Sequence, residues 1–162
     1  MSLTILGIGT VVPQQKIQQH HAALLAGSLL GSKAPAERTM QAMYRQTRIQ
    51  QRFSVVLDKS QDGEIIQDFF DPAETQGDRG PTTAKRMQRY EGEATPLATA
   101  AVKKALDRTN LKPAAITHLI TCSCTGFQAP GIDVALMKKF DLSSQISRTH
   151  IGFMGCHGGF NA

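Results

Sequence analysis

The apolar positions at the start of the chain predict a strand, two helices and a second strand, in that order. The run from Leu3 to Val12 is rich in apolar and β-branched residues and ends at Pro13, so it predicts a buried strand. Helices are expected next, near Gln14 to Leu30 and from Pro35 to about Thr47, since proline is favoured in the first helical turn. Gln50 to Leu57 is compatible with a strand or a hairpin arm.

An acidic, irregular segment separates these elements from a long helix. From Asp58 to Pro81, acidic residues are spread among Gly and Pro, which favours a solvated surface excursion over a catalytic carboxylate pair. Thr82 or Thr83 can then cap a long helix whose apolar positions recur as far as Leu106. We expect Pro96 to bend or break this helix, because proline removes a backbone donor and crowds the preceding turn.

The last part of the chain alternates strand with helix. The pattern predicts a central strand at Ile116 to Cys122, a short helix at Ile132 to Phe140, a strand at Arg148 to Met154, and a helix beginning near Cys156. This alternation favours an α/β fold in which a mostly parallel sheet is covered by helices. With 162 residues, the chain is long enough for one ordinary domain or for one half of a larger duplicated fold.

Composition narrows the function classes. The formal net charge of +5 is mild, and no Lys/Arg block or basic and aromatic interleaving indicates a nucleic-acid surface. Anionic small molecules stay open as partners. The apolar runs are too short to span a membrane, and the first residues do not resemble a signal peptide, so a cytoplasmic location is expected. The cysteines, Cys122, Cys124 and Cys156, are odd in number, which favours free thiols in a reducing compartment.

Cys156 is the candidate nucleophile. It lies in the segment Arg148 to Phe160, RTHIGFMGCHGGF, where an apolar strand meets a glycine-lined helix start. Unpaired N–H groups at a helix start favour a thiolate. The flanking Gly155, Gly158 and Gly159 leave room for the close backbone approach and the N–H donors that an oxyanion site needs. The alternative is a buried structural thiol, which free cysteines commonly are.

The histidines do not complete a site. Adjacent residues of a helix point about 100° apart, so His157 is poorly placed to take the proton of Cys156. The three cysteines could form a zinc site with His118, His150 and His157, but Cys-x-Cys inside an apolar strand lacks the usual zinc spacing, so no metal is expected. His20 and His21 are expected to be a surface or half-buried pair on a helix.

Glycine and arginine patterns give two further candidates. Gly7-Ile-Gly9 follows a predicted strand, but Val12 stands where a dinucleotide fingerprint needs its third glycine, so we expect a tight turn. A loose basic stretch could meet the phosphates of a nucleotide-bearing substrate or form a solvated helix face. Its members are Lys33, Arg38, Arg45, Arg48 and Arg52.

Three segments resemble a known family. The segment Ile116 to Asp133, ITHLITCSCTGFQAPGID, is similar to the strand and pocket loop of the type III polyketide synthases, the chalcone and stilbene synthase family, and Arg148 to Phe160 resembles their nucleophile segment. The run from Tyr90 to Leu106 is similar to the preceding helix. The resemblance implies the N-terminal half of a thiolase-like fold. The residues of these motifs are closer to those of microbial members of the family, many of which make alkylpyrones or alkylresorcinols, than to those of plant chalcone synthases.

The resemblance also implies roles for single residues. Cys156 matches the nucleophile that accepts a starter acyl group from coenzyme A, and Cys124 and Thr125 match positions that line the initiation and elongation pocket. Ala129 matches a position that reaches across the family's dimer interface, where plant enzymes usually carry Met, so a bulky or long starter is expected. The residues that grip coenzyme A fall near Thr39 to Gln46 in the family. This chain offers Arg38 and Arg45 nearby, without a clean register.

The implied activity is that of an acyltransferase that condenses an acyl-CoA starter with malonyl-CoA, with no further cofactor. A homodimer is implied, with Arg148 to Met154 near its two-fold axis and Ala129 close by. In the family the His and Asn that drive condensation, and a gating Phe, lie well beyond the nucleophile. We therefore expect residues 1–162 to be the N-terminal domain without its C-terminal half, and to be inactive in condensation alone.

Two alternatives stay open. A ketoacyl synthase of fatty-acid initiation shares the fold and the Cys, His and Asn chemistry but takes malonyl units from acyl carrier protein. A non-catalytic half-fold that dimerises or binds a partner would use Cys156 as a structural or redox-sensitive residue. The starter acyl group, the number of extensions and the mode of cyclisation do not follow from the sequence.

Overall fold

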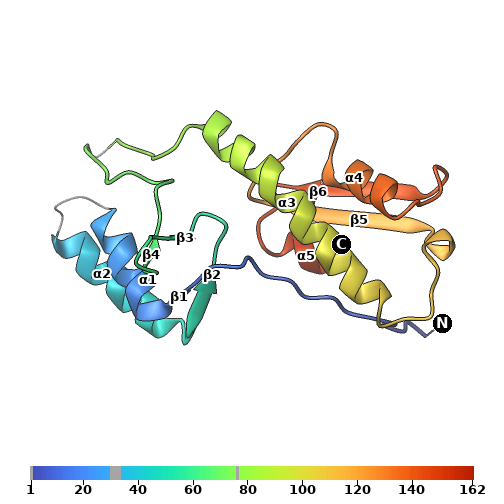
Figure 1. The fold of residues 1–162 in the computed structure, drawn as a ribbon, viewed down its shortest axis with the longest axis horizontal. Coiled ribbons are helices and arrows are strands. Elements are labelled where there is room, and N and C mark those ends of the chain that lie inside the picture. The colour runs from blue at the N-terminus through green and yellow to red at the C-terminus, as the bar shows by residue number, and fades with distance from the viewer. Residues whose placement is uncertain (1, 30–33, 76) are drawn as a thin grey trace. The chain divides into compact units, whose positions relative to one another are not determined.

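The computed structural model describes residues 2–29, 34–75 and 77–162 and divides into two compact units (Figure 1). One unit is Val12–Thr82, and the other combines Met1–Val11 with Thr83–Ala162. The candidate nucleophile and pocket residues fall in the second of these units, and the candidate arginines fall in the first. Each unit is described by itself.

The Val12–Thr82 unit is built from two helices and two small antiparallel strand pairs. Strand β1 (Lys16–Gln18) leads directly into helix α1 (Gln19–Ser28) and pairs with β2 (Gln51–Phe53), with Lys16 opposite Phe53 and Gln18 opposite Gln51. The remaining elements are helix α2 (Ala34–Gln46) and the hairpin of β3 (Asp58–Lys59) and β4 (Ile65–Ile66).

A small apolar core holds this unit together, and one polar side chain lies beside it. Ile17, Ala22 and Leu57 are buried, and Leu25, Tyr44 and Ile65 pack against them. The amide of Gln19 is buried as well, and its hydrogen-bonding groups have partners on α2, on the turn after it and on β2. Satisfied in this way, a buried amide adds specificity to the packing of α1 without the cost of an unpaired polar group.

The second unit carries a parallel strand pair with its crossover helix. Strand β5 (His118–Ser123) and strand β6 (Ser147–Gly152) are parallel, with Cys122 opposite Ile151 and Ser123 opposite Gly152. Helix α4 (Ile132–Lys139) connects them, as a parallel pair requires. The other elements are the long helix α3 (Thr83–Leu106), the 3₁₀ turn η1 (Pro113–Ala115) and the short helix α5 (Gly158–Asn161).

The strand predicted at Leu3 to Val12 is absent, and this expectation was wrong. Residues 2–15 form no strand, and the side chains of Leu3 and Ile5 are 98% and 73% exposed. A strand needs a neighbour to pair with, and the carbonyls of Ile8 and Thr10 instead accept from side chains of α3 and of the turn that follows it. Lys104 Nζ donates to the Thr10 carbonyl at 3.2 Å, and Arg108 Nη1 donates to the Ile8 carbonyl at 2.7 Å.

Gly7 and Gly9 allow the N-terminal segment to lie close to α3. The tight turn expected at these glycines does not form. A Cβ atom at Gly7 would lie 2.6 Å from the Ala105 carbonyl oxygen, and one at Gly9 would collide with the backbone of Ala101. Both glycines therefore let the segment lie against the helix backbone, which a side chain would prevent.

Helix α3 runs through Pro96 without a break, so of the two outcomes expected from the sequence, a bend or a break, the break does not occur. Pro96 cannot donate to the carbonyl of Gly92, four residues earlier. Gly92 is exposed, so water can satisfy that carbonyl.

The structure confirms the other helices and strands of the second unit, with shifts at their ends. In the first unit the helix predicted at Gln14 to Leu30 starts later, after β1, and Leu30 lies outside the described residues. The acidic segment also carries the β3–β4 hairpin.

Among the described residues, no helix combines the length and the apolar character needed to cross a membrane.

Candidate active site

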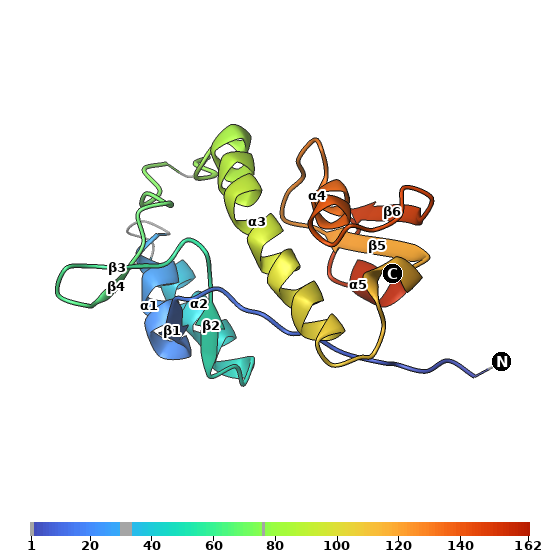
Figure 2. The ribbon, with the colours of Figure 1, turned by 45° about the vertical axis from the view of Figure 1, so that its right-hand side comes forward.

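The nucleophile segment and the pocket loop leave the same edge of the parallel strand pair. Cys124 and Thr125 directly follow β5, and the turn that carries Cys156 directly follows β6. Figure 2 shows the two strands side by side. Because the carboxyl ends of parallel strands meet at one edge of a sheet, ligand sites of α/β folds form there. Cys156, Cys124 and Thr125 are all exposed at this edge.

Two contacts join the loops that follow β5 and β6. The Phe153 N–H donates to the Ser123 carbonyl at 3.0 Å, which extends the strand pairing by one step. The rings of Phe127 and Phe153 meet edge to face, with centroids 5.8 Å apart and planes inclined by 71°. This is a favoured aromatic geometry. The turn that carries Cys156 is thus held against the loop that carries Cys124 and Thr125.

The backbone of the Cys156 turn has an unusual conformation. Phe153 has φ of 56°, which is uncommon for a residue with a side chain, and Gly155 has φ of +74°. The Gly158 N–H donates to the Gly155 carbonyl at 3.0 Å, which closes a tight turn around Cys156. Two left-handed residues in three positions reverse the chain between β6 and α5 and leave Cys156 exposed.

The helix expected to start near Cys156 starts at Gly158 and has four residues, so it supplies few aligned peptide dipoles. The Gly159 N–H donates to the Cys156 carbonyl, and the Gly158 N–H is also engaged. Among the described residues, no acceptor pairs with the N–H groups of Cys156 and His157. These two groups and the Gly155 N–H, which also has no acceptor among the described residues, are available to an oxyanion, whereas those of Gly158 and Gly159 are engaged.

Gly158 and Gly159, which follow Cys156, differ in their surroundings. A Cβ atom at Gly158 would lie 3.2 Å from Cys122 Sγ and 3.3 Å from Met154 Cβ, so this buried glycine lets α5 pack on β5. At Gly159 a Cβ atom would meet nothing within 4 Å. Cys122 therefore lies against the first turn of α5, and it is exposed, as Cys124 and Cys156 are.

Helix α3 holds the pocket loop in place. The Phe127 N–H donates to Met87 Sδ at 3.4 Å, and Gln128 Nε2 donates to Thr95 Oγ1 at 3.3 Å. Gly126 is buried against the ring of Tyr90, where a Cβ atom would collide. Ala129, which follows in this loop, is exposed.

No histidine of the described residues hydrogen-bonds to Cys156. His150 Nδ1 lies 2.8 Å from Thr121 Oγ1, and His118 Nδ1 lies 2.9 Å from Thr117 Oγ1. The ring of His157 is turned toward Gly155. The described residues also contain no group of three His, Cys, Asp or Glu side chains placed to hold a metal ion.

The candidate arginines lie on the other unit. Arg38 and Arg45 are exposed on α2, and their spacing of seven residues puts them on one face of the helix about 10 Å apart along its axis. Neither forms an ion pair among the described residues. Arg52 instead donates to Gln19 and stacks on Tyr44 at 4.8 Å, so it is structural. Lys33 lies outside the described residues.

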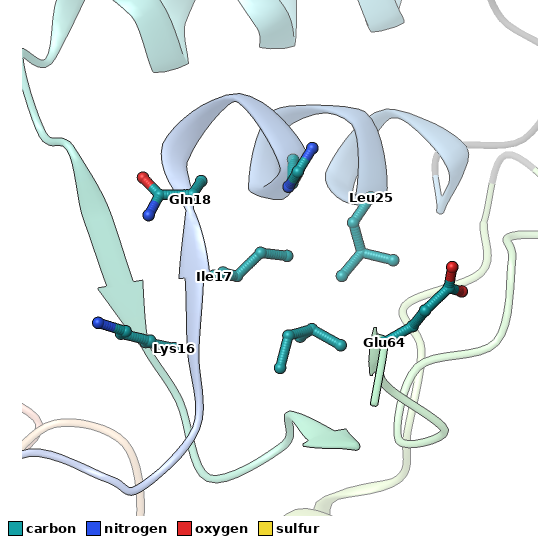
Figure 3. Close-up of a pocket in the computed structure, with 7 residues that line it drawn as sticks. Lys16, Ile17, Gln18, Leu25 and Glu64 are labelled. Atoms are coloured by element: carbon teal, nitrogen blue, oxygen red, sulfur yellow. The ribbon is translucent and has the colours of Figure 1, made fainter. Parts of the chain in front are cut away.

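An apolar cavity of about 460 Å³ also lies in this unit (Figure 3). Ile17 on β1 and Leu25 on α1 point toward the same space, while Lys16 and Glu64 direct their charged ends away from it. None of the candidate residues lines this cavity. His21, which also lines it, is exposed, and its ring is tilted by 52° to that of His20, with centroids 4.0 Å apart.

Comparison with known proteins decides the family. The model of chalcone and stilbene synthases, N-terminal domain, matches residues 2–162. The chain belongs to this family. It is similar to the alpha-pyrone synthesis polyketide synthase-like Pks18 of Mycobacterium tuberculosis, with 33% identity over 98% of the chain and 37% of that protein. The acylalkylpyrone synthase csyB of Aspergillus oryzae is 28% identical over 99% of the chain and 37% of its own length.

Solved structures agree with the α/β fold of a thiolase-like half. PKS-I of the brown alga Ectocarpus siliculosus superposes with a TM-score of 0.72 and 26% identity, covering 97% of this chain and 41% of that one. A type III pentaketide synthase of Neurospora crassa gives 0.73 and 26%, covering 97% and 38%. The chain therefore spans well under half the length of the relatives it matches, and it corresponds to the N-terminal part of a type III polyketide synthase.

The sequence did not reveal the Phe127–Phe153 contact or the packing of Gly126 on Tyr90. The sequence signal for the Phe127–Phe153 contact was the presence of an aromatic residue in each of the two loops of the candidate site. The two residues come into contact because β5 and β6 pair in parallel and bring the loops together.

Proposed function

We propose that the protein is a type III polyketide synthase in which Cys156 carries the growing acyl chain. The observation that carries the proposal is the exposed Cys156 at the carboxyl edge of β5 and β6, beside Cys124 and Thr125. Family membership and the names of the relatives support acyl transfer and condensation as the reaction class.

The first step is acyl loading. The Cys156 thiolate attacks the carbonyl carbon of an acyl-CoA, and the negative charge that develops on the carbonyl oxygen is met by the N–H groups of Cys156 and His157. The carbon–sulfur bond to coenzyme A breaks, coenzyme A leaves as a thiolate that takes up a proton, and the acyl group remains on the Cys156 sulfur. The described site supplies the nucleophile and these N–H groups, and the proton of the Cys156 thiol goes to solvent, because no histidine of the described residues hydrogen-bonds to it.

The second step is decarboxylative condensation. Malonyl-CoA loses carbon dioxide, the resulting carbanion attacks the Cys156 thioester, and the new carbon–carbon bond releases the Cys156 sulfur as a thiolate. This step needs a group that polarises the malonyl thioester. Among the described residues no His or Asn side chain hydrogen-bonds to Cys156, so we assign only the loading step to residues 1–162. Condensation by the isolated chain is not expected.

The substrate class follows from the pocket loop and the relatives. Ala129 is small and exposed, and two relatives carry pyrone synthesis in their names, so we propose a long aliphatic starter and a pyrone product. Arg38 and Arg45, exposed on one face of α2, are proposed to bind the phosphates of coenzyme A. A homodimer and a cytoplasmic location are proposed with the family assignment.

The test supplies purified protein with a series of acyl-CoA starters and isotope-labelled malonyl-CoA, with products identified by mass spectrometry. In the complete enzyme we expect labelled pyrones that disappear in Cys156→Ala and persist in Cys122→Ala, the matched thiol control. Activity that requires malonyl units on acyl carrier protein would instead indicate a ketoacyl synthase. Pyrone formation by residues 1–162 alone would contradict the assignment of the second step.

A further inference from the structure

We propose that the groove between α3 and α4 binds an acidic amphipathic helix of a partner protein. The two helices contact each other within one unit, and an open groove of about 730 Å³ runs along that contact. Of its eight lining residues three are lysines and none is acidic. The groove lies outside the candidate active site and has no part in the proposed reaction.

The floor of the groove is shallow and open. It is lined by small side chains, Thr95, Thr99 and Ala100 from α3 and Ala135 from α4. Helix axes approach most closely where the side chains between them are small. The eight residues of α4 span about 12 Å, which matches two turns of an occupant helix. The small apolar surfaces of Ala100 and Ala135 favour an occupant with an apolar stripe on its inner face.

The lysines at the rim fix the charge of the occupant. Lys103 is neutralised in part by Asp107, with Nζ and Oδ2 2.7 Å apart. Lys138 and Lys139 are exposed at the end of α4 and form no ion pair among the described residues. Asp133 at the start of α4 is already bound by Arg148. Two of the three rim lysines, Lys138 and Lys139, therefore carry positive charge without an ion-pair partner among the described residues, which attracts acidic side chains and repels basic ones.

The test uses a labelled synthetic peptide of about four helical turns, with leucine along one face and glutamate on the others, and measures fluorescence anisotropy against the whole protein. A scrambled peptide of the same composition lacks the amphipathic face, and a third peptide carries lysine in place of glutamate. We expect saturable binding of the amphipathic acidic peptide only, weakened by salt because the contacts are exposed charges.

The decisive variant is Lys138→Glu/Lys139→Glu, and the matched control is Lys59→Glu/Lys112→Glu, which changes the net charge equally at exposed positions outside the groove. We expect about a tenfold loss of affinity in the first variant and less than about twofold in the control. Circular dichroism checks that both remain folded. Equal binding of the scrambled peptide, equal losses in both variants, or complete displacement by inorganic phosphate would overturn the proposal. Each result would indicate nonspecific charge attraction or a small-anion site.

Discussion

The ring of Phe127 meets the ring of Phe153 edge to face, 5.8 Å apart, and so joins the loop after β5 to the loop after β6. The two rings are 55% and 62% exposed, so their contact constrains the loops more than it builds a core. The loops carry Thr125 and Cys156, and the aromatic pair is a side-chain contact between these two loops.

This contact predicts coupling between the two phenylalanines. Leucine at either position keeps apolar bulk but loses the edge-to-face geometry, so Phe127→Leu and Phe153→Leu should show a coupling energy of about 0.5–1.5 kcal/mol in a double-mutant cycle. Urea unfolding measures it. Phe160→Leu, at a residue that is 90% exposed, is the control. Strictly additive effects of the two changes would show that the contact contributes nothing.

Gly155 should be intolerant of a side chain, and Gly159 tolerant of one. At φ of +74° the methyl group of Gly155→Ala strains the backbone by about 1–2 kcal/mol and displaces the Cys156 turn. Gly159→Ala meets open space and should change stability by less than about 0.5 kcal/mol. Unfolding free energies and the rate of thiol alkylation at Cys156 compare the two. Equal behaviour would refute the conformation assigned to this turn.

The Gln19 amide should stabilise the first unit. Its Nε2 donates to the Tyr44 carbonyl at 2.8 Å and to Thr47 Oγ1 at 2.9 Å, and its Oε1 accepts from Arg52 Nε at 2.8 Å. Gln19→Leu leaves these partners without their hydrogen bonds, and we expect a loss of about 1–3 kcal/mol in unfolding free energy. The neighbouring, exposed Gln18 provides the control Gln18→Leu, which should be near neutral. A larger loss at Gln18 would contradict this burial.

Gly9 and Gly92 offer opposite outcomes for the same substitution. Gly9→Ala forces the N-terminal segment away from the backbone of Ala101 and should destabilise by about 1–3 kcal/mol. Gly92→Ala sits in open space on α3 and should stabilise by about 0.5–1 kcal/mol, through higher helix propensity. Thermal and urea unfolding measure both changes. Destabilisation by Gly92→Ala would mean that this part of α3 is packed.

The sequence predicts the elements that can be recognised from their own residues alone. The helical repeat of apolar positions predicts α3, and the apolar run at β5 predicts a strand without reference to any other segment. The run from Leu3 to Val12 has the same apolar character as β5. A strand also needs a neighbouring strand to pair with, and the residues of the run do not show whether one is present. Pro96 failed as a helix breaker because the cost of a lost hydrogen bond depends on whether water reaches Gly92.

The candidate site was predictable in part for the same reason. Cys156 is found from its neighbouring glycines, and Thr125 from the resemblance of its loop. The contact of Phe127 with Phe153 joins positions 26 residues apart through the register of β5 and β6, which no local pattern encodes. The N–H groups left for an oxyanion likewise depend on which turn forms, and α5 begins later than the sequence indicates.

Acylation of Cys156 tests the central claim most directly. The protein is mixed with a long-chain acyl-CoA without malonyl-CoA, and its intact mass is followed by digestion and mapping of the modified peptide. We predict one acyl group, located on Cys156, absent from Cys156→Ala and retained in Cys124→Ala. A modification on Cys124, or an unchanged mass while free Cys156 still reacts with iodoacetamide, would contradict the role of Cys156 as the nucleophile.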